Sequence, residues 1–111
     1  MIPLVFAAIL ALSTDRLNVS IHETTGALAS ITDRRDGAAL VEKSCDRYAL
    51  ERQPGKEVVA TEAEDRVVGR KGEAFICENP RLPGLRIEKA WRVEGRWLTK
   101  RVTFSEVTCC Q

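Results

Sequence analysis

The side chains most able to do chemistry are few and scattered along the chain. His22 is the single histidine, and it precedes Glu23, so an acid–base pair can be imagined there. A general base also needs an orienting partner and a pocket, and the surrounding sequence supplies no motif for either. We therefore interpret His22 as an exposed turn residue, and we predict that this chain contains no catalytic residue and is not an enzyme.

A second group of reactive side chains consists of the carboxylates Glu62, Glu64 and Asp65. Paired carboxylates cleave glycosidic bonds when they face each other across a cleft, which closeness in sequence does not establish. A strand predicted over residues 57–64 would place Glu62 and Glu64 on one face. We expect both of these side chains to be solvated.

Four cysteines are present, but their spacing fits no metal site. They lack a CxxC motif, and a single histidine cannot complete a zinc pattern, so we predict no metal and no cofactor. Adjacent cysteines such as Cys109 and Cys110 rarely bond to each other. A Cys45–Cys77 disulfide and a reduced Cys77 on the apolar face of a strand both remain open, and we favour the reduced thiol.

Trp91 and Trp97 lie in the strongest structural pattern of the chain, a hairpin predicted over residues 85–94 and 97–104. A two-residue type II′ turn at Gly95-Arg96 collects the apolar residues on one face, and a shift by one residue scatters them. The predicted opposite pairs are Val93/Leu98, Trp91/Lys100, Lys89/Val102 and Ile87/Phe104. This register places Trp91 in the core beneath the Lys100 stem, and Trp97 on the opposite face.

The candidate ligand-binding residues are Trp97 and Arg96, beside that turn. A flat aromatic ring matches the C–H face of a pyranose, so an exposed Trp97 could contact a carbohydrate. A tryptophan that simply covers the rim of the sandwich is the alternative, and we regard it as the simpler interpretation.

Alternating apolar residues predict further strands along most of the remaining chain. Residues 57–70 have some helical propensity, but their β-branched valines favour two strands. Eight or nine short strands separated by turns predict an all-β fold, an antiparallel β-sandwich or part of one. The expected strands outside the hairpin cover residues 17–21, 27–33, 38–41, 47–52, 57–64, 66–70 and 74–78.

The N-terminus carries an uncharged apolar run over residues 2–12, followed by Ser13. Its length suits the hydrophobic part of a signal peptide and is too short to span a bilayer, so we predict no membrane span. We predict a signal peptide over residues 1–13, a β-sandwich domain or an N-terminal fragment of one over residues 14–111, and a secreted or periplasmic location. A buried first strand or a short core helix is the alternative for the apolar run.

Composition excludes one class of partner. The 111 residues include 17 basic and 16 acidic side chains, with both signs interspersed and a net charge of +1. Proteins that bind nucleic acid usually concentrate basic residues on one face, and this chain shows no such concentration. We therefore predict no nucleic-acid partner.

Two stretches resemble a known family. LNVSIHETTGALASITD at residues 17–33, with Asp36-Gly37 and Leu40-Val41 after it, resembles the opening hairpin of galactose-mutarotase-like β-supersandwich domains. IEKAWRVEGRWLTKRVTF at residues 87–104 is similar to a long hairpin of the same domains. Such domains often stand at the N-terminus of exported glycoside hydrolases.

The resemblance implies an incomplete supersandwich, because a full one is far longer than this chain. The catalytic histidines and glutamate of the mutarotases come from later strands, and the catalytic acids of the hydrolases belong to a following domain, so no catalytic residue carries over. The implied function is that of a non-catalytic N-terminal segment of an exported carbohydrate-active protein, with a structural or cleft-shaping role. The implied partners are a carbohydrate and a downstream catalytic domain. A stand-alone glycan- or protein-binding module is the alternative.

Overall fold

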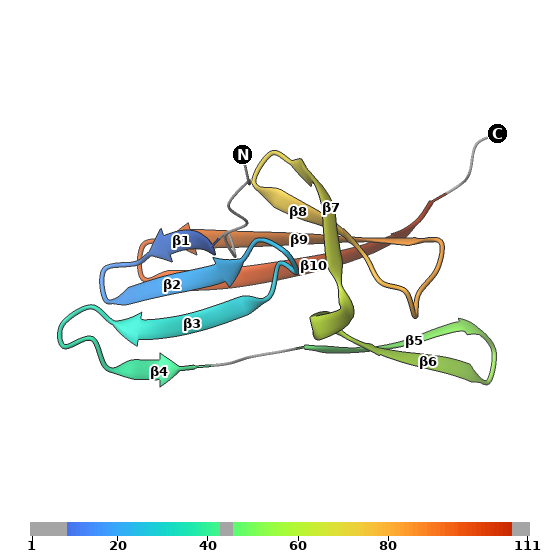
Figure 1. Cartoon of the computed structure of the whole chain (residues 1–111), viewed down its shortest axis with the longest axis horizontal. Helices are drawn as coiled ribbons and strands as arrows, with labels where there is room; N and C mark the ends of the chain where they lie inside the picture. Colours follow the sequence, from blue (N-terminus) through green and yellow to red (C-terminus); the bar gives the residue numbers. More distant parts are fainter. Residues whose placement is uncertain (1–8, 43–45, 108–111) are drawn as a thin grey trace, which may run out of the picture.

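The computed structural model describes residues 9–42 and 46–107, which form antiparallel strands and one short 3₁₀ helix (Figure 1). The predicted all-β antiparallel fold is confirmed. The helix, η1 (Glu62–Glu64), lies between β6 and β7. The strands are β1 (Ile9–Ser13), β2 (Leu17–His22), β3 (Leu28–Asp33), β4 (Ala39–Val41), β5 (Arg47–Gln53), β6 (Lys56–Thr61), β7 (Arg66–Lys71), β8 (Ala74–Glu78), β9 (Leu85–Glu94) and β10 (Trp97–Glu106).

The strands form three sheets. The first has the order β1-β2-β3-β4, the second has the order β10-β9-β8-β7, and β5 and β6 make a separate hairpin. In Figure 1, β1 overlaps the end of β9, while the β5–β6 hairpin extends at one end of the molecule. The first two sheets pack as a sandwich-like pair, and the hairpin joins them through a contact between Tyr48 and Phe104, whose rings meet edge to face at 5.2 Å.

The core lies between the sheets because apolar residues alternate along the strands that face it. Val19 and Ile21 of β2 are fully buried, as is Ile87 of β9. Burial of each such side chain contributes about 1.5–3 kcal/mol to folding. The buried apolar cluster consists of Val19, Ile21, Tyr48, Ala60, Phe75, Cys77, Leu82, Leu85, Ile87 and Trp91.

The predicted register of the β9–β10 hairpin is confirmed at every pair. Gly95 has φ of +61°, and Arg96 keeps a negative φ, which is the combination that a type II′ turn requires. Trp91 is buried at 7% exposure, as predicted, and the ammonium of Lys100 lies 5.1 Å from its ring centroid.

The turn between β2 and β3, in the first sheet, is hydrogen-bonded to strands of the second sheet. Gly26 has φ of +74°, which closes the turn as its N–H donates to the carbonyl of His22 at 2.7 Å. The Trp91 indole Nε1–H donates to the Gly26 carbonyl at 3.0 Å, and the Val67 N–H donates to Thr24 at 2.9 Å. His22 itself is exposed at the end of β2.

Two expected elements differ from the structure. The strand expected over residues 57–64 ends at Thr61, and Glu62–Glu64 instead form η1, which closes with a hydrogen bond from Asp65 N–H to Glu62. The described residues contain ten strands because Ile9–Ser13 form β1 and pair with β2. The alternative for the apolar run expected a buried strand, whereas the side chains of β1 are exposed or half-buried. Residues 1–8 of the predicted signal peptide lie outside the described residues, and its cleavage stays a prediction.

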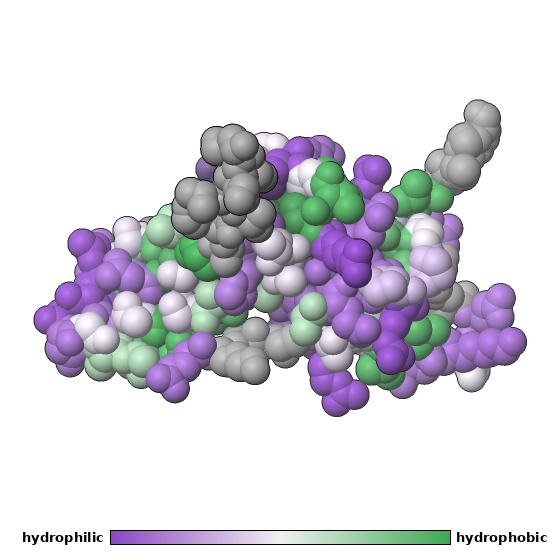
Figure 2. All heavy atoms as spheres, in the orientation of Figure 1, coloured by the Kyte–Doolittle hydropathy of each residue, from purple (hydrophilic) through white to green (hydrophobic). Residues whose placement is uncertain are grey.

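The space-filling view shows polar and apolar residues interspersed over the face drawn (Figure 2). Within residues 9–42 and 46–107, no helix has the length and apolar character needed to cross a bilayer.

Candidate functional site

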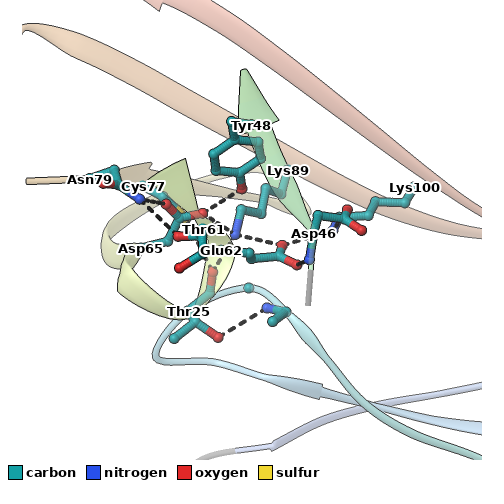
Figure 3. A network of polar contacts seen from close by, with 12 residues as sticks. Thr25, Asp46, Tyr48, Thr61, Glu62, Asp65, Cys77, Asn79, Lys89 and Lys100 are labelled. Atoms are coloured by element: carbon teal, nitrogen blue, oxygen red, sulfur yellow. Dashed lines mark hydrogen bonds and ion pairs between the residues drawn. The ribbon is translucent and has the colours of Figure 1, made fainter. Parts of the chain in front are cut away.

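A cluster of charged and polar side chains fills the junction of the three sheets (Figure 3). We name it the Lys89 cluster, after the residue at its centre. Its side chains come from β5 and the residue before it, from η1 and the residue after it, from the residue after β8, and from β9 and β10. Its members are Asp46, Tyr48, Glu62, Asp65, Asn79, Lys89 and Lys100.

Lys89 reaches the interior because of its position in β9. Alternation along this strand places it between Ile87 and Trp91, on the face that packs against the core. Its side chain is 0% exposed. Its ammonium donates to the carbonyl oxygen of Thr25 at 2.6 Å, to Oε2 of Glu62 at 2.7 Å and to Oδ2 of Asp65 at 2.5 Å. Each of its three protons therefore has an acceptor.

The prediction from the sequence that the Glu62 side chain is solvated is wrong. Its side chain is 1% exposed rather than solvated, because the 3₁₀ turn directs it inward while Glu64 faces outward and pairs with Arg81 at 3.2 Å. Oε2 of Glu62 accepts hydrogen bonds from both Lys89 and Lys100, each at 2.7 Å, and Oε1 accepts from the Asp46 N–H at 3.2 Å. Glu62 thus has two ammonium groups beside one carboxylate oxygen.

Asp65 has a different set of neighbours. The Tyr48 hydroxyl donates to its Oδ2 at 2.6 Å, and the Asn79 amide donates to its Oδ1 at 2.7 Å. Burial, together with the hydrogen bond to Asp65, raises the pKa of Tyr48 far above its ordinary value, so the hydroxyl keeps its proton. Both oxygens of Asp65 are therefore held by neutral donors, and Oδ2 also contacts the ammonium of Lys89.

Lys100 and Asp46 form the rim of the Lys89 cluster. The Lys100 side chain is 16% exposed, and its ammonium lies 2.5 Å from Oδ2 of the half-exposed Asp46. Burial alone would lower the pKa of Lys100, but the hydrogen bonds to Asp46 and Glu62 outweigh it and raise this pKa. Lys100 is thus held in its charged form.

The buried side chains of the Lys89 cluster all have hydrogen-bond partners, and its centre, formed by Lys89, Glu62 and Asp65, is closed to solvent. Among the described residues, no buried side-chain nitrogen or oxygen lacks a hydrogen-bond partner. Buried charges of this kind are stable only when they are paired and hydrogen-bonded. Because Lys89, Glu62 and Asp65 have almost no exposed surface, an external substrate cannot reach them. The cluster can hold the three sheets together, and its reactive groups can act on one another.

Two pockets lie elsewhere on the surface. One, of about 480 Å³, is bounded by Leu10 and Leu12 of β1 and by the end of β9. The other, of about 740 Å³, includes Val68 and Val107. Neither of these two is lined by Arg96 or Trp97.

The structure places Trp97 and Arg96 side by side at the exposed tip of the β9–β10 hairpin. Trp97 is 69% exposed, as the predicted register implies, and lies on the face of the sheet opposite Trp91. Arg96 is also exposed. No further polar group is brought to them by a described contact, and their role in ligand binding stays a prediction.

Of the four cysteines, only Cys77 lies among the described residues. Cys77 is buried and is a free thiol among the described residues, and burial raises its pKa to about 11. Cys45, Cys109 and Cys110 lie outside the described residues. Within the described ranges, no group of three or more His, Cys, Asp or Glu side chains could hold a metal ion.

No family model, curated protein or solved structure matches this chain.

Proposed function

We propose that this chain is a non-catalytic N-terminal β-sandwich segment of an exported carbohydrate-active protein. Its role is structural: it packs against a catalytic domain downstream, or helps to shape the carbohydrate cleft of that domain. In this arrangement the fold is the opening part of a larger supersandwich. The carbohydrate connection rests on the resemblance of residues 17–33 and 87–104, and the structural role is supported by the geometry of β10.

The observation that carries the structural role is the open edge of the second sheet. β10 is ten residues long and forms one end of that sheet in the described part of the chain. Its inward-facing Leu98, Val102 and Phe104 are only half-buried. Long edge strands with apolar residues are usually paired or covered, because they otherwise associate with other strands. A further strand or domain packed against β10 would supply that cover.

The closed Lys89 cluster supports a non-catalytic role. Its central groups, Lys89, Glu62 and Asp65, are shielded from any external substrate. The contacts of the cluster tie η1, β5, β9 and the β2–β3 turn together. A junction held by such contacts would suit a segment whose role is to position a downstream catalytic domain.

The test is the sequence of the transcript beyond the codon for Gln111. We expect an open reading frame that continues into further strands and a glycosidase-like domain. Amide hydrogen exchange of the 111-residue chain and of the longer protein then compares β10 directly, and the β10 amides should exchange more slowly in the longer protein. A stop codon immediately after Gln111, or equal exchange in both proteins, contradicts the proposal.

A stand-alone glycan-binding module is the second candidate, and the exposure of Trp97 is the observation that favours it. Stacking of a sugar ring on Trp97 would change its fluorescence during titration with a panel of soluble oligosaccharides. The response should disappear in Trp97→Ala and persist in Arg101→Ala, which changes another exposed residue of β10. If no oligosaccharide in the panel changes the fluorescence, the chain is not a glycan-binding module of this kind.

A further inference from the structure

Three groups of the Lys89 cluster have the arrangement needed to form a covalent bond within the chain. We propose that the Lys89 side chain condenses with the Asp65 carboxyl group after folding, with Glu62 transferring the protons. The product is an amide that joins β9 to the segment between η1 and β7. The inference does not depend on the proposed function.

The two reacting groups are in contact and isolated from water. Nζ of Lys89 lies 2.5 Å from Oδ2 of Asp65, and both side chains are 0% exposed. Holding two reactants together in this way replaces an encounter in solution, and such placement raises rates by many orders of magnitude. Exclusion of water also favours condensation, because the other product of the reaction is water.

The surroundings distinguish the two carboxylates that Lys89 touches. Asp65 is hydrogen-bonded by the neutral donors Tyr48 and Asn79, which would withdraw electrons from its carbonyl and stabilise the oxygen charge that develops during attack. Glu62 is hydrogen-bonded by the ammonium of Lys100. Oε2 of Glu62 also lies 2.7 Å from Nζ of Lys89, so Glu62 is placed to accept a proton from that nitrogen. Asp65 is therefore the acyl group, and Glu62 is the base.

The reaction balances without an oxidant or a second reactant. Transfer of one proton from the ammonium to Asp65 gives a neutral amine and a carboxylic acid, which carry less charge in a buried site than the ion pair. Nζ attacks Cγ of Asp65 and forms the C–N bond while Asn79 holds Oδ1. Glu62 takes a proton from Nζ and delivers it to Oδ2, the C–O bond breaks, and one water leaves. The remaining N–H can donate to the Thr25 carbonyl.

Mass spectrometry of the purified native chain tests the proposal. After the folded protein is incubated at neutral pH, denatured and digested with trypsin, we expect a branched peptide that joins Asp65 to Lys89. Its mass should equal the sum of the peptides at residues 57–66 and 87–92 minus one water. Trypsin should also fail to cleave after Lys89, because an amide-linked lysine carries no positive charge. This measurement does not depend on where the N-terminus is processed.

Two matched variants in η1 identify the base. Glu62→Gln keeps the shape of the side chain but cannot accept the proton, so the cross-link should form at least about a hundredfold more slowly. Glu64→Gln changes an exposed residue of the same helix and should cross-link at the native rate. Lys89→Arg should give linear peptides alone.

Linear peptides alone from native protein that circular dichroism shows to be folded would overturn the proposal. A Glu62→Gln variant that cross-links at the native rate would overturn the role of Glu62 as base. If Glu62→Gln does not fold, the native protein still decides whether the bond forms. In that case, a slower reaction in Tyr48→Phe supports activation of Asp65 by its hydrogen-bond donors, and an unchanged rate contradicts it.

Discussion

The middle and the tip of the β9–β10 hairpin belong to one element but have opposite environments. In the middle, Lys89 and Lys100 are held by carboxylates in a buried network. At the tip, Arg96 and Trp97 are exposed and touch little else. The same register produces both, because it determines which side chains face the core and where the strands extend beyond it. The comparison shows that a charged side chain of this hairpin is not necessarily exposed, because the lysine side chain of Lys89 is completely buried.

The largest expected effect is on the free energy of unfolding when Lys89 is replaced by Met. In the folded chain before any condensation with Asp65, loss of the ammonium leaves two carboxylates, Glu62 and Asp65, buried without their shared cation. Breaking a buried ion pair in this way destabilises a protein by about 3–5 kcal/mol. Denaturant unfolding followed by circular dichroism measures the change.

Lys71→Met is the matched control for Lys89→Met. Lys71 lies 3.9 Å from Glu88 and is 73% exposed, and exposed ion pairs contribute about 0–1 kcal/mol. Similar losses in the free energy of unfolding in the two variants would contradict the burial of the Lys89 ion pairs.

The two tryptophans of the hairpin provide the next comparison. Trp91→Ala removes a buried ring and its hydrogen bond to Gly26, and truncation of a buried tryptophan destabilises by about 3 kcal/mol or more. Trp97→Ala removes an exposed ring and should change stability by about 0.5 kcal/mol or less. Thermal unfolding of both variants measures the difference. Acrylamide should quench the fluorescence of Trp97 and leave most of that of Trp91, and equal quenching would be evidence against the described register.

Local pattern was sufficient to predict much of the fold. Alternation of apolar residues predicted the β9–β10 register, the burial of Trp91 and the position of Trp97 on the opposite face, because each depends on neighbours within one hairpin. It also located the turn at Gly26 and the strand β8. The all-β class follows from the same local signals repeated along the chain.

The Lys89 cluster was not predicted, because its members are far apart in sequence and meet only after the sheets pack. Glu62 was assigned to a solvated strand face, since a period of two was extended past Thr61 into a segment that turns as a 3₁₀ helix. One signal was present. Lys89 shares the predicted apolar face with Ile87 and Trp91, and a lysine at such a position needs a buried acidic partner. The sequence alone does not identify which carboxylate supplies it.

A smaller effect is expected where the β2–β3 turn approaches Lys89. A methyl group added at Gly26 would strain a backbone with φ of +74° and would lie 3.0 Å from Cδ of Lys89. Gly55 has a similar φ of +77° but has open space around it. Gly55→Ala should destabilise by about 1–2 kcal/mol from backbone strain alone. Gly26→Ala should destabilise by about 1 kcal/mol more, because Lys89 must leave its preferred rotamer. Equal losses in urea denaturation would show that Lys89 does not pack against this turn.

The smallest expected effect concerns an exposed ion pair far from the Lys89 cluster. The Arg35 guanidinium and its backbone N–H hydrogen-bond to the Asp33 carboxylate and lower the pKa of Asp33 from 3.8 to about 2. Because the folded-state pKa lies below the unfolded value, the stabilising contribution is present above pH 3.8 and is lost as the pH falls through about 2. A carboxyl titration followed by NMR should give a midpoint of about 2 for Asp33. Arg35→Met should move that midpoint up toward 3.8, whereas Arg34→Met, which removes a hydrogen bond to Thr14 instead, should leave it low. An unchanged midpoint in Arg35→Met would mean that the low pKa of Asp33 has another cause.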